Sequence, residues 1–96
     1  MSRGPNGLVT IRPATAIAFR KKCGLSQAGL AAKATVILRE RTGDQMASIS
    51  ESLVALIETG RRQPSVRNAE ALALAMDITV DALADIRSAE GEPVSA

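Results

Sequence analysis

The sequence predicts an all-α fold of five helices, and three observations support this. The chain has 96 residues and is 46% hydrophobic, yet Phe19 is its one aromatic residue. Strand-rich chains usually carry more aromatic and β-branched residues, whereas small and aliphatic side chains pack well between helices. Apolar residues also recur at helical spacing, and capping residues or glycines bound each such segment. The length fits one small domain.

The first two helices begin at recognisable start signals. Pro13 opens the first helix, because its missing N–H would be unpaired in a first turn anyway. Lys22 lies at the end of this helix, and Gly24 can close it in the left-handed conformation. Ser26 is a favourable N-cap for the second helix, in which no residue breaks the helical pattern before Gly43. Its apolar face consists of Leu30, Ala31, Ala34, Ile37 and Leu38.

The third helix is expected to run from about Gln45 to Thr59. Asp44 can cap its beginning, and Gly60 ends it. A broad apolar face suggests that this helix packs on two sides. One stripe of that face recurs at helical spacing and comprises Met46, Ile49, Leu53 and Leu56.

The last two helices follow a loop of Arg61, Arg62, Gln63 and Pro64. Ser65 is the expected cap of the fourth helix, and Thr79 is the expected cap of the fifth. The buried stripe of the fourth helix consists of Val66, Ala69, Leu72, Ala73 and Met76, and that of the fifth consists of Val80, Leu83 and Ile86.

The chain divides into an arm, a helical domain and a tail. We expect residues 1–12 to form a flexible N-terminal arm or short strand, residues 13–87 the domain, and residues 88–96 a disordered tail. The apolar stretch 8–11 is the candidate strand, and its character would allow pairing with another copy. No apolar run approaches the roughly 18 residues needed to cross a bilayer. The beginning of the chain has no apolar signal segment, so a cytoplasmic location is expected.

Charge is spread unevenly along the sequence. Residues 1–67 hold 11 Lys/Arg and 4 Asp/Glu, which gives +7, whereas residues 68–96 hold 1 and 6, which gives −5. A basic region suits a polyanionic partner, because neutralisation of phosphates supplies most non-specific affinity for DNA. The alternative is ordinary surface charge followed by an acidic tail.

The composition argues against catalysis and against a metal site. The chain has no histidine and one cysteine, Cys23, so an internal disulfide is excluded and a zinc site is not expected. No Gly-rich phosphate loop and no nucleophile–base pair is present, and no cofactor is implied. Glu40, Asp44 and Glu51 are read as caps and solvated charges. We therefore expect a protein that is not an enzyme.

Three blocks of the sequence resemble the phage-repressor (Xre-type) helix-turn-helix family. LSQAGLA, residues 25–31, resembles its second helix, and ISESLVALIETGRRQPS, residues 49–65, resembles its third helix and the loop that follows. AEALALAMDITVDAL, residues 69–83, resembles its closing portion. The match spans residues 14–86 with the blocks in the right order. It implies a five-helix phage-repressor-like domain that binds double-stranded DNA.

In such a domain the first motif helix lies across the phosphate backbone and the second enters the major groove. The resemblance assigns Ser26 and Gln27 to the backbone-contacting helix start and Arg61 and Arg62 to phosphate contacts. The residues expected to contact DNA are Ser26, Gln27, Lys33, Arg39, Arg41, Ser50, Glu51, Ser52, Ala55, Arg61 and Arg62.

The chain departs from the family pattern in two ways. About 13 extra residues separate the first two blocks when Ile49 is aligned where Val36 would otherwise fall. The family's short turn begins with Gly, whereas Thr35 stands there in this chain. We expect lengthened second and third helices, joined at Gly43 and Asp44 into a projecting hairpin. The reading helix is also unusual, because it lacks the Arg, Lys, Asn and Gln residues that make strong base contacts.

Two functions therefore stand as hypotheses. The first is a sequence-specific transcriptional regulator that binds a palindromic site as a dimer. The second is a protein-interaction module on the same scaffold, which binds a partner protein through the lengthened hairpin. Burial of the stripe would favour the first, and exposure would favour the second. Its residues are Met46, Ile49, Leu53 and Leu56.

Overall fold

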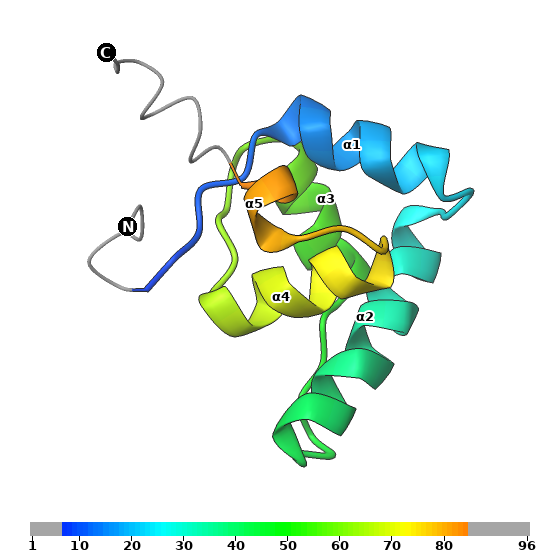
Figure 1. Cartoon of the computed structure of the whole chain (residues 1–96), viewed down its shortest axis with the longest axis vertical. Coiled ribbons are helices and arrows are strands. Elements are labelled where there is room, and N and C mark those ends of the chain that lie inside the picture. The colour runs from blue at the N-terminus through cyan, green and yellow to red at the C-terminus, as the bar shows by residue number, and fades with distance from the viewer. Residues whose placement is uncertain (1–6, 85–96) are drawn as a thin grey trace.

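The computed structural model describes residues 7–84. Within this range the chain forms only helices and isolated β-bridges, which confirms the predicted all-α class (Figure 1). Ile86, the tail 88–96 and the first six residues lie outside the described residues. The helices are α1 (Pro13–Lys22), α2 (Gln27–Thr42), α3 (Glu51–Glu58), α4 (Val66–Ala75) and α5 (Val80–Leu83).

The helices pack around a core of small and aliphatic side chains. α2 packs against both α4 and α3, α1 packs against α3, and α5 packs against α4. Many of the core residues are alanines, which let helix axes approach closely. No helix among residues 7–84 combines the length and apolar character needed to cross a membrane. The most deeply buried large side chains are Ile11, Pro64 and Leu83.

The predicted starts of α2, α4 and α5 are confirmed by hydrogen bonds. Ser26 Oγ accepts from the Gly29 amide at 2.9 Å, Ser65 Oγ from the Asn68 amide at 3.1 Å, and Thr79 Oγ1 from the Ala82 amide at 3.1 Å. Each bond satisfies an amide that the first helical turn leaves without a backbone acceptor. Short-range signals are thus sufficient to place these helix starts.

The third helix begins later than predicted. It starts at Glu51 instead of about Gln45, and its cap is Ser50 instead of Asp44, because Ser50 Oγ accepts from the Leu53 amide at 3.0 Å. Asp44 instead accepts from the Met46 amide at 2.9 Å within a turn. The prediction of a hairpin between two lengthened helices is therefore wrong. α2 alone is long, and the segment 43–50 returns from its end to α3 without helical structure (Figure 1).

Residues 8–11 are extended and belong to the folded domain. Leu8 and Ile11 form isolated antiparallel bridges with Ser65 and Ala84, and the Ile11 amide donates to Gln63 Oε1 at 2.8 Å. Ile11 is only 2% exposed. Val9 and Ile11, which precede the expected domain 13–87, thus belong to the core. The segment pairs within its own chain.

Candidate nucleic-acid interface

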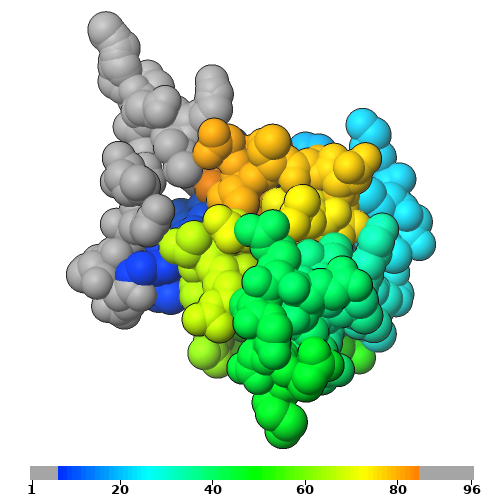
Figure 2. All heavy atoms as spheres, turned by 60° about the horizontal axis from the view of Figure 1, so that its bottom comes forward, coloured from blue at the N-terminus to red at the C-terminus, as the bar shows by residue number. Residues whose placement is uncertain are grey.

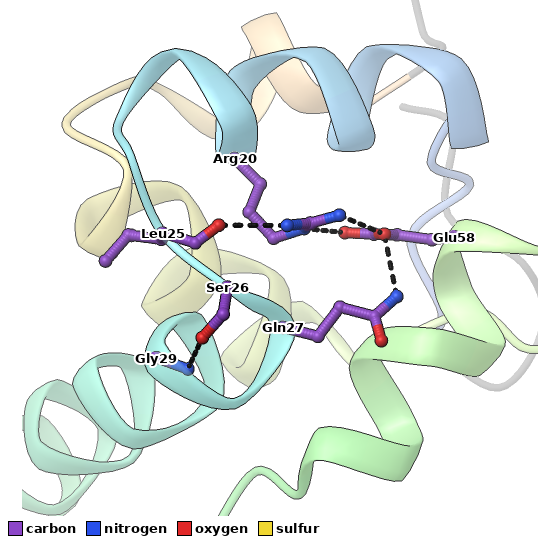
Figure 3. A network of polar contacts seen from close by, with 6 residues as sticks. All are labelled: Arg20, Leu25, Ser26, Gln27, Gly29 and Glu58. Atoms are coloured by element: carbon purple, nitrogen blue, oxygen red, sulfur yellow. Dashed lines mark hydrogen bonds and ion pairs between the residues drawn. The ribbon is translucent and has the colours of Figure 1, made fainter.

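A buried ion pair connects α1 to α3 (Figure 3). Arg20 Nε donates to Glu58 Oε2 at 2.7 Å, and Arg20 Nη2 donates to Glu58 Oε1 at 3.1 Å. Arg20 Nη1 also donates to the Leu25 carbonyl at 2.9 Å, in the turn between α1 and α2. The side chains of Arg20 and Glu58 are only 12% and 5% exposed. The two parallel bonds of this pair hold α3 in a defined orientation.

Gln27 completes this network from the first turn of α2. Its Nε2 donates to Glu58 Oε1 at 3.0 Å, so the carboxylate accepts from both α1 and α2 (Figure 3). Gln27 was expected to contact phosphate, yet its amide nitrogen bonds inside the protein and its side chain is half-buried. Within the fold, Gln27 holds the start of α2 beside the end of α3.

The network controls the ionisation of Glu58. Burial acts to raise the pKa of this carboxyl, but the hydrogen bonds from Arg20 and Gln27 and the charges of Arg20 and Lys21 outweigh burial. The pKa of Glu58 is therefore lower than its ordinary value. The same contact raises the pKa of Arg20. Both groups are charged at neutral pH.

The second half of α2 and the loop that follows it depart from the rest of the fold and return to it at Thr35 and Ile49. Thr35 Oγ1 donates to the Ile49 carbonyl at 3.1 Å and accepts from the Ile49 amide at 2.9 Å. These bonds join the middle of α2 directly to the segment just before α3, whose cap is Ser50. Residues 36–48 are therefore an excursion closed at its base. Before the excursion, α2 contacts α3 through the bond from Gln27 to Glu58.

Two arginines of the excursion are used within the chain. Arg39 Nε donates to the Ala47 carbonyl at 2.8 Å, which fixes the returning loop to α2. Arg41 forms a surface ion pair with Glu70 of α4, at 3.3 Å between Nη2 and Oε1. Both were expected to contact DNA from a projecting hairpin. The structure instead places Arg39 in a contact within the excursion and Arg41 in a contact between the excursion and α4.

The outer face of α3 is accessible along its N-terminal half. Ser50, Glu51 and Ser52 are exposed and Ala55 is half-buried, whereas Val54 and Ile57 are buried against the core. The polar residues predicted to face bases thus lie together on one surface. Ser26 and Lys33 are exposed on α2.

Two further cations lie just beyond α3. The amides of Arg61 and Arg62 donate to the Leu56 carbonyl at 2.9 and 3.3 Å, and Gly60 adopts a φ of +78° that permits this tight turn. Both arginine side chains are exposed, and neither forms an ion pair with another residue of the described range 7–84. They remain available to an anionic partner.

The predicted apolar stripe does not form one surface. Met46 and Ile49 both precede α3 and lie in the returning loop. Met46 is 86% exposed, whereas Ile49 is 3% exposed. Leu53 and Leu56 are half-buried, and Leu53 packs against the core. The stripe was inferred from helical spacing, and the late start of α3 removes that spacing. Of the four stripe residues, Met46 is the one whose side chain is exposed, at the tip of the excursion.

Sequence reasoning missed the supporting residues of this interface. Arg20 was not singled out, although it forms two hydrogen bonds to Glu58 of α3. Thr35 was noted only as a departure from the family pattern, and its two bonds to Ile49, just before α3, were not foreseen. A charge at Glu58, on the apolar side of a predicted helix, was the available signal that a buried cation should lie nearby. No group of three or more His, Cys, Asp or Glu in the described part of the chain is arranged to hold a metal ion. Comparisons with protein-family models, with curated proteins and with solved structures found no match.

Proposed function

We propose that this protein is a DNA-binding transcriptional regulator of the phage-repressor type, which acts as a dimer on a palindromic site. The observation that carries the proposal is the arrangement of α3. Its inner face is fixed through Glu58 to α1 and α2, and the N-terminal half of its outer face is free. A rigidly held helix with an exposed polar face suits entry into a major groove.

The closed excursion supports the same reading. An insertion between the two motif helices would be expected to separate them. The Thr35–Ile49 pair instead rejoins the chain at the base of the inserted residues. The pairing of α2 with α3 therefore does not depend on the length of the excursion, which is compatible with a helix-turn-helix unit in this chain.

The proposed contacts divide into positioning and reading. Arg61, Arg62 and the exposed start of α2 at Ser26 would contact phosphates, which orient the protein without reading sequence. Glu51 and Ser52 would face base edges, where a carboxylate accepts from the cytosine amino group. Without an arginine, lysine or amide side chain on α3, direct readout is modest, so preference for one site rests on few contacts.

The test is binding of the full chain to the DNA upstream of its own coding sequence, against a scrambled duplex of equal length, across a salt series. We expect tighter binding to the upstream duplex that persists near physiological salt. Equal binding to both duplexes that disappears with salt, or no binding, would remove the proposal.

A second candidate function is a protein-interaction module, which the exposure of Met46 favours. This flexible apolar side chain is 86% exposed at the tip of the excursion, and Met is common on protein-binding surfaces. If DNA binding is the function, Met46→Ser should leave DNA affinity within about twofold, because surface substitutions away from an interface have small effects. If a partner protein is bound through the tip, the same substitution should weaken that complex and not DNA binding.

A further inference from the structure

The outer face of α2 is a helix surface that no other described element covers. Its two sides are occupied, since Arg41 pairs with Glu70 of α4 and Arg39 bonds the loop that returns to α3. Between these sides lies an exposed surface with Val36, 56% exposed, at its centre. Figure 2, in which the bottom of Figure 1 comes forward, shows the green end of α2 and the following loop standing out from the molecule. The exposed residues of this surface are Ala28, Ala32, Lys33, Val36 and Glu40.

The surface carries two opposite charges, Lys33 and Glu40, which lie on the same side of Val36. Lys33 and Glu40 are seven positions apart, which turns them by only about 20° around a helix axis of 3.6 residues per turn. At about 1.5 Å per residue they lie roughly 10 Å apart along the axis, too far to pair with each other. Neither forms an ion pair with another residue of the described range 7–84. The face therefore presents one cation and one anion, neither of which is paired within residues 7–84.

We propose that this face binds a second copy of the same chain, with the two α2 helices antiparallel about a two-fold axis. The midpoint between Lys33 and Glu40 falls between Val36 and Ile37. Antiparallel helices related about that midpoint bring Lys33 of each copy level with Glu40 of the other, on the same flank. Val36 then meets its own counterpart beside the axis. One pattern is thus complementary to itself, as a two-fold interface requires.

The residues beside Val36 permit this approach. Ala32 is exposed and Gly29 is half-buried on α2 near Val36, and neither the alanine methyl group nor glycine, which has no side chain, prevents close contact of two helix backbones. A pair of helices buries less area than a standard interface, so we expect a dissociation constant on the order of 100 µM without DNA. The charge pairs make the interface specific for a second copy, and the small buried area makes it weak.

The arrangement also has a consequence for DNA. A two-fold axis that relates antiparallel helices keeps corresponding flanks on the same side of the pair. The flank that carries Arg39 and the returning loop leads to α3 in both copies. Both α3 helices would then lie on one side of the dimer. The inference does not depend on DNA binding, and its test uses no DNA.

The test is sedimentation equilibrium of the full chain and of the variants Lys33→Glu and Glu40→Lys. Each variant alone places like charges opposite each other at both symmetric positions, so we expect its dissociation constant to rise about tenfold at low salt. An equimolar mixture of the two variants places opposite charges at both positions, and we expect the mixture to dimerise as the unmodified chain does. Arg67→Glu is the matched control, because it reverses an exposed cation on α4 and changes the net charge equally.

Weaker association of each variant, restored on mixing and reduced in high salt, supports the interface. An unmodified chain that stays monomeric at about 1 mM overturns it, since even weak interfaces associate there. Equal association of Lys33→Glu, Glu40→Lys and Arg67→Glu also overturns it, because a dimer would then use another face. DNA binding by a chain that dimerises through another face would leave the proposed function standing and would refute this inference.

Discussion

Glu58 places a carboxylate among core side chains, where a charge is costly unless hydrogen bonds and an opposite charge compensate for burial. Arg20 supplies two bonds and the charge, and Gln27 supplies a third bond. These partners come from α1 and α2, so one side chain of α3 fixes the relative positions of three helices. At the scale of a residue, the orientation of the proposed reading helix therefore depends on a side chain that faces away from DNA.

Substitution of Glu58 should be strongly destabilising. Glu58→Ala leaves the Arg20 guanidinium buried without its acceptor, and we expect a loss of about 3 kcal/mol in the free energy of unfolding. Urea denaturation measures this change. Glu51→Ala, which removes an exposed carboxylate from the same helix, is the control and should stay within about 0.5 kcal/mol. Equal stability of the two variants would contradict a structural role for the pair.

The same carboxylate predicts a pH dependence. The pKa of Glu58 is lower in the folded state than in the unfolded chain, so the folded state holds fewer protons through this group. Its contribution is fully present above the unfolded value of about 4.3 and is lost as the pH falls through the lower folded value. Urea midpoints measured from neutral to acidic pH should fall less steeply for Glu58→Gln than for the unmodified chain. Parallel curves would show that the group is not stabilised as a carboxylate.

At the scale of an element, the length of α2 and the start of α3 have different origins. α2 ends at a local signal, because Gly43 adopts a φ of +73° and its amide donates to the Arg39 carbonyl at 2.8 Å. The returning loop instead obtains its hydrogen bonds from Thr35 and Arg39, which lie on α2. Because these side chains satisfy its backbone, the loop does not continue as helix.

The base of the excursion can be tested at Thr35. Thr35→Val keeps the shape of the side chain and removes both bonds to Ile49, so we expect a loss of about 1–2 kcal/mol in the free energy of unfolding. Thr35→Ser retains the hydroxyl and is the matched control. If the excursion holds the two motif helices together, Thr35→Val should also weaken DNA binding more than Thr35→Ser does. Identical urea midpoints for the two variants would show that the bonds do not matter.

The end of α2 can be tested at Gly43. Proline cannot adopt a positive φ and has no amide to donate to Arg39, so we expect Gly43→Pro to lose helix content and at least about 2 kcal/mol of stability. Gly43→Asn is the comparison, because asparagine tolerates the left-handed conformation. Circular dichroism and urea denaturation measure the two effects. Retention of full stability by Gly43→Pro would place the turn elsewhere.

At the scale of the molecule, the positions of the exposed cations matter more than the net charge of +2. Arg20 pairs with the buried carboxylate of Glu58, Arg39 bonds the Ala47 carbonyl, and Arg41 forms a surface pair with Glu70. Arg61 and Arg62 remain exposed next to α3. Phosphate contacts in the proposed complex should therefore depend strongly on this pair.

Removal of both arginines should weaken binding to every sequence. For Arg61→Ala combined with Arg62→Ala we expect lower affinity for the upstream and the scrambled duplex alike, with the slope of log affinity against log salt reduced by about 2. A salt series on both duplexes measures this, and the urea midpoint should hardly change because both side chains are exposed. An unchanged slope would show that these arginines do not contact phosphate.

The sequence by itself determined the all-α class, the caps Ser26, Ser65 and Thr79, and the stop at Gly43. These features depend on contacts within a few residues, so propensity, periodicity and capping chemistry are sufficient to predict them. A continuous helical pattern also predicted the unusual length of α2 correctly.

Only the tertiary structure decided where α3 begins, which arginines are free and what the stripe does. Thr35 and Ile49 are separated by the whole excursion, and Arg20 and Glu58 lie on different helices, so no local pattern reveals either pair. The spacing of Met46 and Ile49 fits a helix, yet the segment forms a turn and a non-helical loop that α2 holds by hydrogen bonds. Long-range bonds outweigh a weak local preference, because propensity contributes only tenths of a kcal/mol per residue whereas an unsatisfied buried backbone group costs about 1–3 kcal/mol.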